Sequence, residues 1–272
     1  MTADTVASLT CRAVTADEVA RYDEHGWAKL PGLVLPQTAQ ALLAMAKVRM
    51  GEDGQGNEVS PMAQPFFNPE VSDGPSSPVL RPLMEKLGAN ARALMQRREG
   101  VGVRYFGDLF APKLPAAAST RHPGAGATYY HQDFINWALD RSGGLTFWIA
   151  LEDLRPESGT MSFFSGSHRM GAMGHYRSYE GASDIRDDYP ELATRCSETG
   201  PMTYRAGDAT VHHNLMVHGA AENLTDRPRW AWLLIANPED ARWTGAPPEA
   251  YATEGMEHLD WLDDDTRFPL IG

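Results

Sequence analysis

Two side chains that can bind a metal lie close together in YYHQDFINW, residues 129–137: His131 and Asp133. On an extended strand, residues i and i+2 project to the same face, so this imidazole and carboxylate would point at one spot. Together with one further histidine they would form a 2-His-1-carboxylate triad. Such a triad leaves open positions on one face of the ion and is typical of non-haem Fe(II) oxygenases. The sequence therefore predicts a metal site, provided that it supplies a third ligand.

The segment TVHHNLMVHG, residues 210–219, carries three histidines that could complete the triad: His212, His213 and His218. Strand parity puts His212 and His218 on one face and His213 on the other, so spacing alone leaves the first two open. A zinc hydrolase can use the same ligand types, although it usually holds the metal tetrahedrally with one open position. A metal-dependent enzyme that does not use an oxo-acid co-substrate is thus a second interpretation.

The elements that must position these residues fall into two regions, and the first, residues 1–100, is predicted to be mainly helical. Thr15 and Glu18 form a capping-box pattern that opens a short helix ending near Gly26. Helical periodicity continues over residues 35–50 and 78–99. The stretch between them is rich in Gly, Pro and Ser and is predicted to be a long loop.

The second region, residues 101–240, is predicted to consist of strands. The runs VGVRYFGDLF, LTFWIAL, ATVHHNLMVHG and WAWLLIA are β-branched or aromatic and are separated by turn sequences. Many short strands without alternating helices predict a mainly β (α+β) fold, a sandwich or jelly-roll barrel, in a single domain over residues 1–272. We expect an insertion at about 169–200 and a C-terminal tail over 241–272, with a solvated acidic stretch at 260–268.

Composition limits the partners and the compartment. Lys and Arg total 24 against 36 Asp and Glu, so the formal net charge is −12. This charge argues against nucleic acid and anionic membrane surfaces as partners. No stretch approaches the ~18 apolar residues of a membrane span, and the N-terminus lacks a secretory pattern. Cys11 and Cys196 match no metal or redox spacing, so we expect free thiols and a cytoplasmic protein.

Several ordered motifs carry a family resemblance. They are HQD at 131–133, WIALED at 148–153, ESGTMSFFSGSH at 157–168, AGD at 206–208 and HGAAENLTDRPRWA at 218–231, after DEHGWAKLPGLV at 23–34. In this order they resemble the phytanoyl-CoA dioxygenase family of Fe(II)- and 2-oxoglutarate-dependent oxygenases. The resemblance covers about residues 15–240. It implies a double-stranded β-helix, or jelly-roll, core with flanking N-terminal helices.

The resemblance also implies roles for individual residues. His218 is expected to be the distal iron ligand beside His131 and Asp133, and Arg229 to bind the far carboxylate of 2-oxoglutarate. An arginine fork suits this role because a buried carboxylate is costly without a bidentate partner. The expected cofactors are Fe(II), 2-oxoglutarate as co-substrate, and O2.

One position departs from the family pattern. Ala220 stands where the family often has Ser or Thr, whose hydroxyl helps to bind the co-substrate. Tyr129, Tyr130 or Thr146 could supply the missing bond. Thr146 and Trp148 share parity on their strand, and the resemblance puts both near the co-substrate.

Aromatic and methionine side chains near the expected mouth predict a bulky, largely apolar small-molecule substrate. They are Phe66, Phe67, Phe134, Trp137 and Met173. Relatives tailor natural products, so hydroxylation, or ring closure or epimerisation through a substrate radical, is expected. Asp133 argues against halogenation, because halogenating relatives replace this carboxylate with a small residue. The oligomeric state stays open, and a non-catalytic jelly-roll binding protein is the third interpretation.

Overall fold

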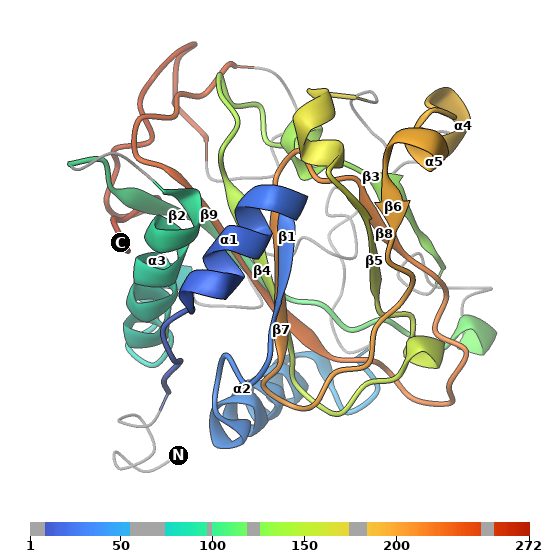
Figure 1. Cartoon of the computed structure of the whole chain (residues 1–272). Coiled ribbons are helices and arrows are strands. Elements are labelled where there is room, and N and C mark those ends of the chain that lie inside the picture. The colour runs from blue at the N-terminus through green and yellow to red at the C-terminus, as the bar shows by residue number, and fades with distance from the viewer. Residues whose placement is uncertain (1–8, 55–73, 97–99, 119–125, 174–183, 246–252) are drawn as a thin grey trace.

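The core of the computed structural model consists of two facing antiparallel sheets (Figure 1). The structure describes residues 9–54, 74–96, 100–118, 126–173, 184–245 and 253–272. One sheet has the order β1 (Trp27–Leu30), β7 (Ala209–His213), β4 (Leu145–Ala150), β9 (Ala231–Pro238), β2 (Val103–Phe110). The other has the order β3 (Thr128–His131), β8 (His218–Ala220), β5 (Met161–Ser165), β6 (Ser197–Glu198). The predicted mainly β jelly-roll class is thereby confirmed.

Three longer helices precede most of the strands and cover one face of the five-stranded sheet: α1 (Ala16–His25), α2 (Pro36–Met50) and α3 (Arg81–Met95) (Figure 1). The capping box of α1 forms as predicted, because Thr15 accepts from the Glu18 amide and Glu18 accepts from the Thr15 amide. Gly26, with φ 77°, ends the helix. No helix among the described residues is long and apolar enough to cross a membrane.

Short helices lie between the longer helices and strands. They are the α-helices α4 (Ile185–Asp188) and α5 (Leu192–Arg195), and the 3-10 helices η2 (Gly74–Ser76), η3 (Ala116–Ala118), η4 (Asp133–Asn136), η5 (Pro156–Ser158) and η6 (Ser167–Met170). In the expected insertion at about 169–200, the described residues 184–200 form α4 and α5, followed by the edge strand β6.

Alternation along the central strands divides the five-stranded sheet into two buried faces. On β4, Leu145, Phe147 and Ile149 pack into the apolar cluster that contains the helices, whereas Thr146 and Trp148 line a cavity between the sheets. The strand β9 alternates in the same way. Both faces are covered, which explains why these strands read as continuous apolar runs. The same alternation determines which side chains of these strands face the cavity between the sheets.

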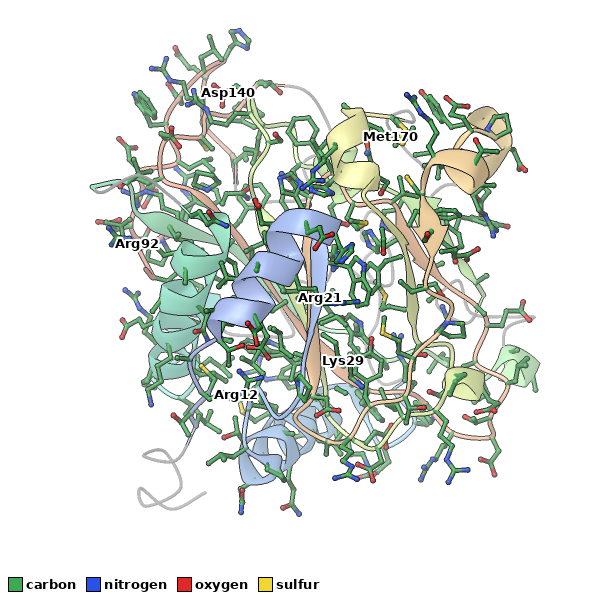
Figure 2. The ribbon with its side chains drawn as sticks, viewed as in Figure 1. Arg12, Arg21, Lys29, Arg92, Asp140 and Met170 are labelled. Carbon is green, nitrogen blue, oxygen red and sulfur yellow. The ribbon has the colours of Figure 1, made fainter. Side chains whose placement is uncertain are left out.

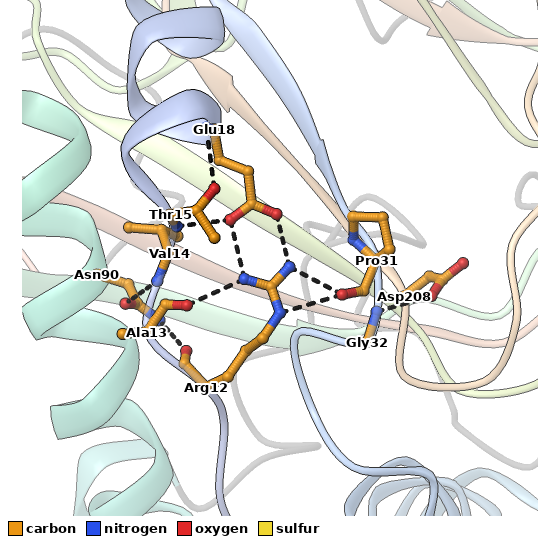
Figure 3. A network of polar contacts seen from close by, with 9 residues as sticks. All are labelled: Arg12, Ala13, Val14, Thr15, Glu18, Pro31, Gly32, Asn90 and Asp208. Atoms are coloured by element: carbon orange, nitrogen blue, oxygen red, sulfur yellow. Dashed lines mark hydrogen bonds and ion pairs between the residues drawn. The ribbon is translucent and has the colours of Figure 1, made fainter.

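A polar network fixes the segment before α1 (Figure 3). Arg12 makes two bonds to the Glu18 carboxylate, of 2.8 and 2.6 Å, and it donates to the Pro31 carbonyl. Asn90 of α3 accepts from the Val14 amide at 2.9 Å. These contacts tie α1 and α3 to the turn that follows β1, and so they hold β1 against β7.

Charged side chains cover the free edge of β1. Lys29 donates to the Thr203 carbonyl at 2.6 Å and lies 3.8 Å from the Asp208 carboxylate. The guanidinium of Arg21 lies 5.0 Å from the centroid of the Trp27 ring. Figure 2 shows Arg21 and Lys29 along this side of the molecule. Such side chains hinder another strand from pairing with the edge.

The expectation of a solvated acidic stretch at 260–268 is only partly right, because Asp260, Asp263 and Asp265 are exposed but two apolar residues between and after them are not. Leu262 and Phe268 are buried, and the chain end continues along β2, where the Ile271 amide donates to the Val103 carbonyl at 2.9 Å. The segment therefore packs on the core through these two apolar residues, while most of its carboxylates stay in solvent.

Gly88→Ala is expected to lower the free energy of unfolding by about 1–3 kcal/mol, although alanine is the better helix former by about 1 kcal/mol. An added Cβ would lie 2.0 Å from the Ile271 carbonyl oxygen, and two backbone bonds to Val103 stop that segment from receding. Urea unfolding measures the change. Ala89→Gly, at an exposed position of the same helix, is the control that isolates helix propensity. A higher midpoint for Gly88→Ala would contradict the packing argument.

Candidate active site

A cavity between the two sheets collects the residues that can do chemistry. Its polar side chains come from both sheets and from the turns that follow β3 and precede β9: Thr128, His131, Asp133, Thr146, His212, His218 and Arg229. The rest of its wall is apolar: Leu109, Ala111, Trp137, Trp148, Met161, Ala220, Leu233 and Ile235. A concave apolar wall with a few converging polar groups is the usual form of a small-molecule site.

The two residues of the HQD motif leave the end of β3 together. The prediction that one strand carries both is only partly right, because β3 ends at His131 and Asp133 begins η4. Gln132 between them keeps an extended backbone, with φ −111° and ψ 134°, and its side-chain amide donates to the Leu215 carbonyl at 2.7 Å. The two metal-binding side chains therefore still project to one side.

His218 stands opposite His131 on the neighbouring strand β8. One ligand atom from each of His131, Asp133 and His218 lies within 4.8 Å of the other two. The Nε2 atoms of the histidines lie 3.5 and 3.6 Å from Asp133 Oδ1. The structure thus brings together the three residues that the sequence predicted as ligands.

Hydrogen bonds at the other ring nitrogens orient both ligand histidines. Nδ1 of His131 lies 2.7 Å from the Tyr129 carbonyl oxygen, and Nδ1 of His218 lies 2.9 Å from that of Met216. A carbonyl oxygen can only accept, so each Nδ1 carries a proton, and in a neutral ring Nε2 is then the nitrogen with the lone pair that binds a metal. This is the usual support of metal-binding histidines.

The second oxygen of Asp133 is held away from the ligand histidines. Oδ2 accepts from the Thr146 hydroxyl at 2.9 Å and lies 3.2 Å from His212 Nε2. Thr146, expected beside the co-substrate, thus orients the carboxylate, as does His212, which parity had left open as a ligand. With Oδ2 occupied, Oδ1 faces His131 and His218 and offers one lone pair for a metal.

The protonation states suit a divalent cation. Burial by itself raises the pKa of Asp133, but His218, His131 and His212 outweigh it and hold that pKa well below its usual range. Burial, with His212 and His131 nearby, holds the pKa of His218 well below its usual range. A charged carboxylate and a neutral imidazole are the forms that bind metal. Two nitrogens and one oxygen on one face fit Fe(II) with open positions opposite them.

Arg229 is a buried cation in the same cavity. Its Nη1 donates to the Gly159 carbonyl at 2.9 Å, and its Nη2 reaches the Ala111 carbonyl only at 3.5 Å. Among the described residues, its Nε has no hydrogen-bond partner. Burial lowers the pKa of Arg229 to about 10, and its guanidinium lies 5.0 Å from the Trp148 ring centroid. An unsatisfied guanidinium in a cavity fits the carboxylate of a bound oxo-acid.

The three side chains that were expected to supply a hydroxyl to the co-substrate make other contacts or lie at the surface. The Tyr129 side chain is half exposed, the Tyr130 hydroxyl donates to the carboxylate of Glu198, and Thr146 bonds Asp133. Thr128, which the sequence analysis missed, also lines the cavity, and its hydroxyl oxygen accepts from the Lys113 ammonium at 3.0 Å. A threonine on a short strand carries no local signal of its role.

The residues predicted to contact the substrate do not all lie at the cavity. Trp137 lines it, and Phe134 is partly buried in the apolar cluster that also contains Trp137. Met173 is buried in a separate cluster with Tyr130 and Phe164, away from the lining. Phe66 and Phe67 lie outside the described residues. Contact with substrate stays a prediction for all five.

Thr146→Val is expected to weaken Fe(II) binding about 10–100-fold, as loss of a bond that orients a ligand typically does. Valine fills the same volume but removes the 2.9 Å donor to Oδ2 of Asp133, so that only His212 holds this oxygen and the carboxylate can rotate more easily. Anaerobic titration of the apo-protein with Fe(II) measures the affinity. Thr210→Val makes the same change at a buried position of β7 that lies outside the cavity lining, and it should bind iron like the native protein. Equal affinities in all three proteins would refute the orienting role.

A 2-His-1-carboxylate cluster between the two sheets of a jelly roll is the arrangement typical of mononuclear non-haem iron oxygenases. The chain belongs to the phytanoyl-CoA dioxygenase family, whose model matches residues 14–231. Phytanoyl-CoA dioxygenase 1 of Oryza sativa subsp. japonica is 28% identical over 173 residues, which span 61% of this chain. The aligned segment covers 57% of the length of that relative.

Solved structures share the fold over nearly the whole chain. The non-haem α-ketoglutarate-dependent carbocyclase SnoK from nogalamycin biosynthesis has a TM-score of 0.73 at 23% identity, covering 95% of this chain and 97% of its own. The epimerase SnoN, in complex with Fe3+, α-ketoglutarate and nogalamycin RO, has a TM-score of 0.70 at 22% identity, with 94% and 98% covered. At these identities the likeness establishes the shared fold.

Proposed function

We propose that this protein is an Fe(II)- and 2-oxoglutarate-dependent oxygenase that oxidises a bulky, largely apolar small molecule. The observation that carries the proposal is the cluster of His131, Asp133 and His218 in a buried cavity that also contains the incompletely bonded guanidinium of Arg229. A metal triad alone would also suit a hydrolase. A buried cation in the same cavity supports a co-substrate with a second, distal carboxylate.

Each residue has a distinct task in the proposed reaction. His131, Asp133 and His218 would hold Fe(II), which, with 2-oxoglutarate and O2, supplies the oxidant and releases succinate and CO2. Arg229 would bind the far carboxylate of the co-substrate and fix its direction. The apolar side chains around the triad would exclude water from the reacting carbon.

The cavity wall and the family membership support a natural-product tailoring step. Apolar side chains from β2, β5 and β9 surround the polar cluster, as suits a hydrophobic ligand. SnoK and SnoN are a carbocyclase and an epimerase of nogalamycin biosynthesis, so this fold supports ring closure and epimerisation as well as hydroxylation. Because Asp133 occupies the position at which a halide would have to bind, halogenation is disfavoured. A cytoplasmic location and the lack of nucleic-acid or membrane partners stay predictions from composition.

The proposal is tested without knowledge of the substrate. Fe(II) and then 2-oxoglutarate are added to the apo-protein without oxygen, and the visible metal-to-ligand charge-transfer band is recorded. Succinate is then assayed after oxygen is admitted. A band and succinate are expected. Bound iron with neither would favour a metal enzyme that does not use 2-oxoglutarate, and absence of iron binding would favour a binding protein.

A further inference from the structure

Lys113 is a second buried cation beside Arg229. Its side chain is fully buried, and its backbone pairs with that of Arg229 in an antiparallel bridge, with N–H to O distances of 2.8 and 2.9 Å. Residues directly opposite each other in such a pair project to the same face. The two cationic side chains therefore lie next to each other, on a segment that the Asn223 side chain also ties to the Lys113 carbonyl.

In the part of the chain that the structure describes, neither Lys113 nor Arg229 forms an ion pair with a carboxylate. Burial and the neighbouring Arg229 lower the pKa of Lys113 to about 7. The acidic groups that act on the pair are Glu222, which is exposed, and Glu152, which accepts from the Trp230 amide. A buried cation without an anion destabilises the fold, so a bound anion that keeps both Lys113 and Arg229 charged would stabilise this arrangement.

Thr128 connects Lys113 to the cavity. The ammonium of Lys113 donates to Thr128 Oγ1 at 3.0 Å, and Thr128 lines the cavity together with Arg229. Because the hydroxyl oxygen accepts from Lys113, its own proton is free to point away from the ammonium. The hydroxyl thus offers a donor on the cavity side.

Thr128 also lies where it can replace the hydroxyl that Ala220 lacks. In the register of β3 and β8, Thr128 and Ala220 are directly opposite, and both side chains line the cavity. Directly opposed Cβ atoms lie about 4.5–5.5 Å apart, so a hydroxyl on either residue reaches nearly the same space. A donor lost from one strand can therefore be supplied by its neighbour.

We propose that the Thr128 hydroxyl, positioned by Lys113, joins Arg229 in binding the far carboxylate of 2-oxoglutarate and takes the place of the hydroxyl missing at Ala220. This inference rests on the proposed function. Thr128 contacts the co-substrate, whereas Lys113 is a positioning residue that acts through Thr128 and contributes positive charge to the subsite.

The test compares two oxo-acids on the Fe(II)-loaded protein without oxygen. 2-Oxoglutarate and 2-oxopentanoate share the metal-chelating end, but the second has a methyl group in place of the far carboxylate. Thr128→Val is expected to raise the Kd of 2-oxoglutarate about ten-fold or more, as loss of a hydrogen bond to a charged group does. The Kd of 2-oxopentanoate should change less than about two-fold, because it makes no such bond. A general disturbance of the site would weaken both ligands.

Three further variants separate the roles. Thr128→Ser should retain 2-oxoglutarate affinity, and the double variant Thr128→Val with Ala220→Ser should regain most of it. Lys113→Met should weaken 2-oxoglutarate selectively while raising the melting temperature of the apo-protein, because it removes an unbalanced buried charge. A melting temperature that falls while the Kd is unchanged would make Lys113 merely structural.

The outcomes distinguish this inference from the proposed function. If the native protein binds Fe(II) and gives no charge-transfer band with either oxo-acid, the proposed function itself fails. If the native protein gives the band and Thr128→Val keeps the native Kd for 2-oxoglutarate, the function stands and the inference is overturned. An equal loss for both oxo-acids would also overturn it.

Discussion

His218→Ala is expected to abolish specific Fe(II) binding and, with it, the charge-transfer band that 2-oxoglutarate induces. His218 supplies one of two nitrogen ligands, and its ring is already oriented by the bond from Nδ1 to the Met216 carbonyl. The remaining His131 and Asp133 would leave too few protein ligands for a stable site. We expect the iron affinity to fall by more than the ~100-fold that loss of an outer contact can cause. Anaerobic titration and metal analysis of the desalted protein measure this loss.

His213→Asn is the matched control for that variant. His213 points to the opposite side of β7 from His212, toward Tyr22 and His168, and its Nδ1 accepts from the Leu215 amide at 3.0 Å. Asparagine can keep that acceptor, so iron binding should be preserved. Native iron affinity in His218→Ala would contradict the assignment. His212 would then be the next candidate, because its Nε2 already lies 3.2 Å from Asp133.

The residues that sequence alone predicted share a local signal. The spacing of His131 and Asp133 and the parity of His212 and His218 all depend on backbone repeats over a few residues. The capping box at Thr15 is equally local, and it forms as expected. The family motifs added the choice of His218 and Arg229, which spacing did not decide.

The parts that sequence did not predict depend on contacts between distant segments. Thr128 acquires its place from pairing with Ala220, and nothing near either residue encodes the register of β3 on β8. In the sequence, Lys113 has the pattern of an exposed loop lysine, but its backbone bridge to Arg229 places it in the interior. The acidic C-terminal stretch was predicted only in part, because its charge gave no sign that Leu262 and Phe268 within it are buried. The pairing of segments distant in sequence therefore determines which residues surround the predicted metal ligands.

Arg229→Ala is expected to raise the Kd of 2-oxoglutarate about 30-fold or more while leaving Fe(II) binding intact. Removing one partner of a buried, hydrogen-bonded charge pair costs about 2–5 kcal/mol, because the other charge stays buried and unpaired. Arg229 is buried, and the donors that its bonds to the Gly159 and Ala111 carbonyls leave unused, Nε among them, are available to a carboxylate. The Kd of 2-oxoglutarate for Arg229→Lys should lie between those of the native protein and Arg229→Ala, since lysine keeps the charge but loses the bidentate fork. Titration of the charge-transfer band measures each Kd.

Arg227→Ala provides the control for Arg229→Ala, because Arg227 has the same strand parity but an exposed side chain. It should bind 2-oxoglutarate with native affinity, which separates the buried contact from the general effect of a lost positive charge.

The loss of affinity in Arg229→Ala should also depend on which oxo-acid is bound. Arg229→Ala should leave 2-oxopentanoate binding nearly unchanged, because that ligand presents no far carboxylate to the guanidinium. Equal weakening of both oxo-acids would mean that Arg229 supports the cavity through its bond to the Gly159 carbonyl rather than by holding the co-substrate.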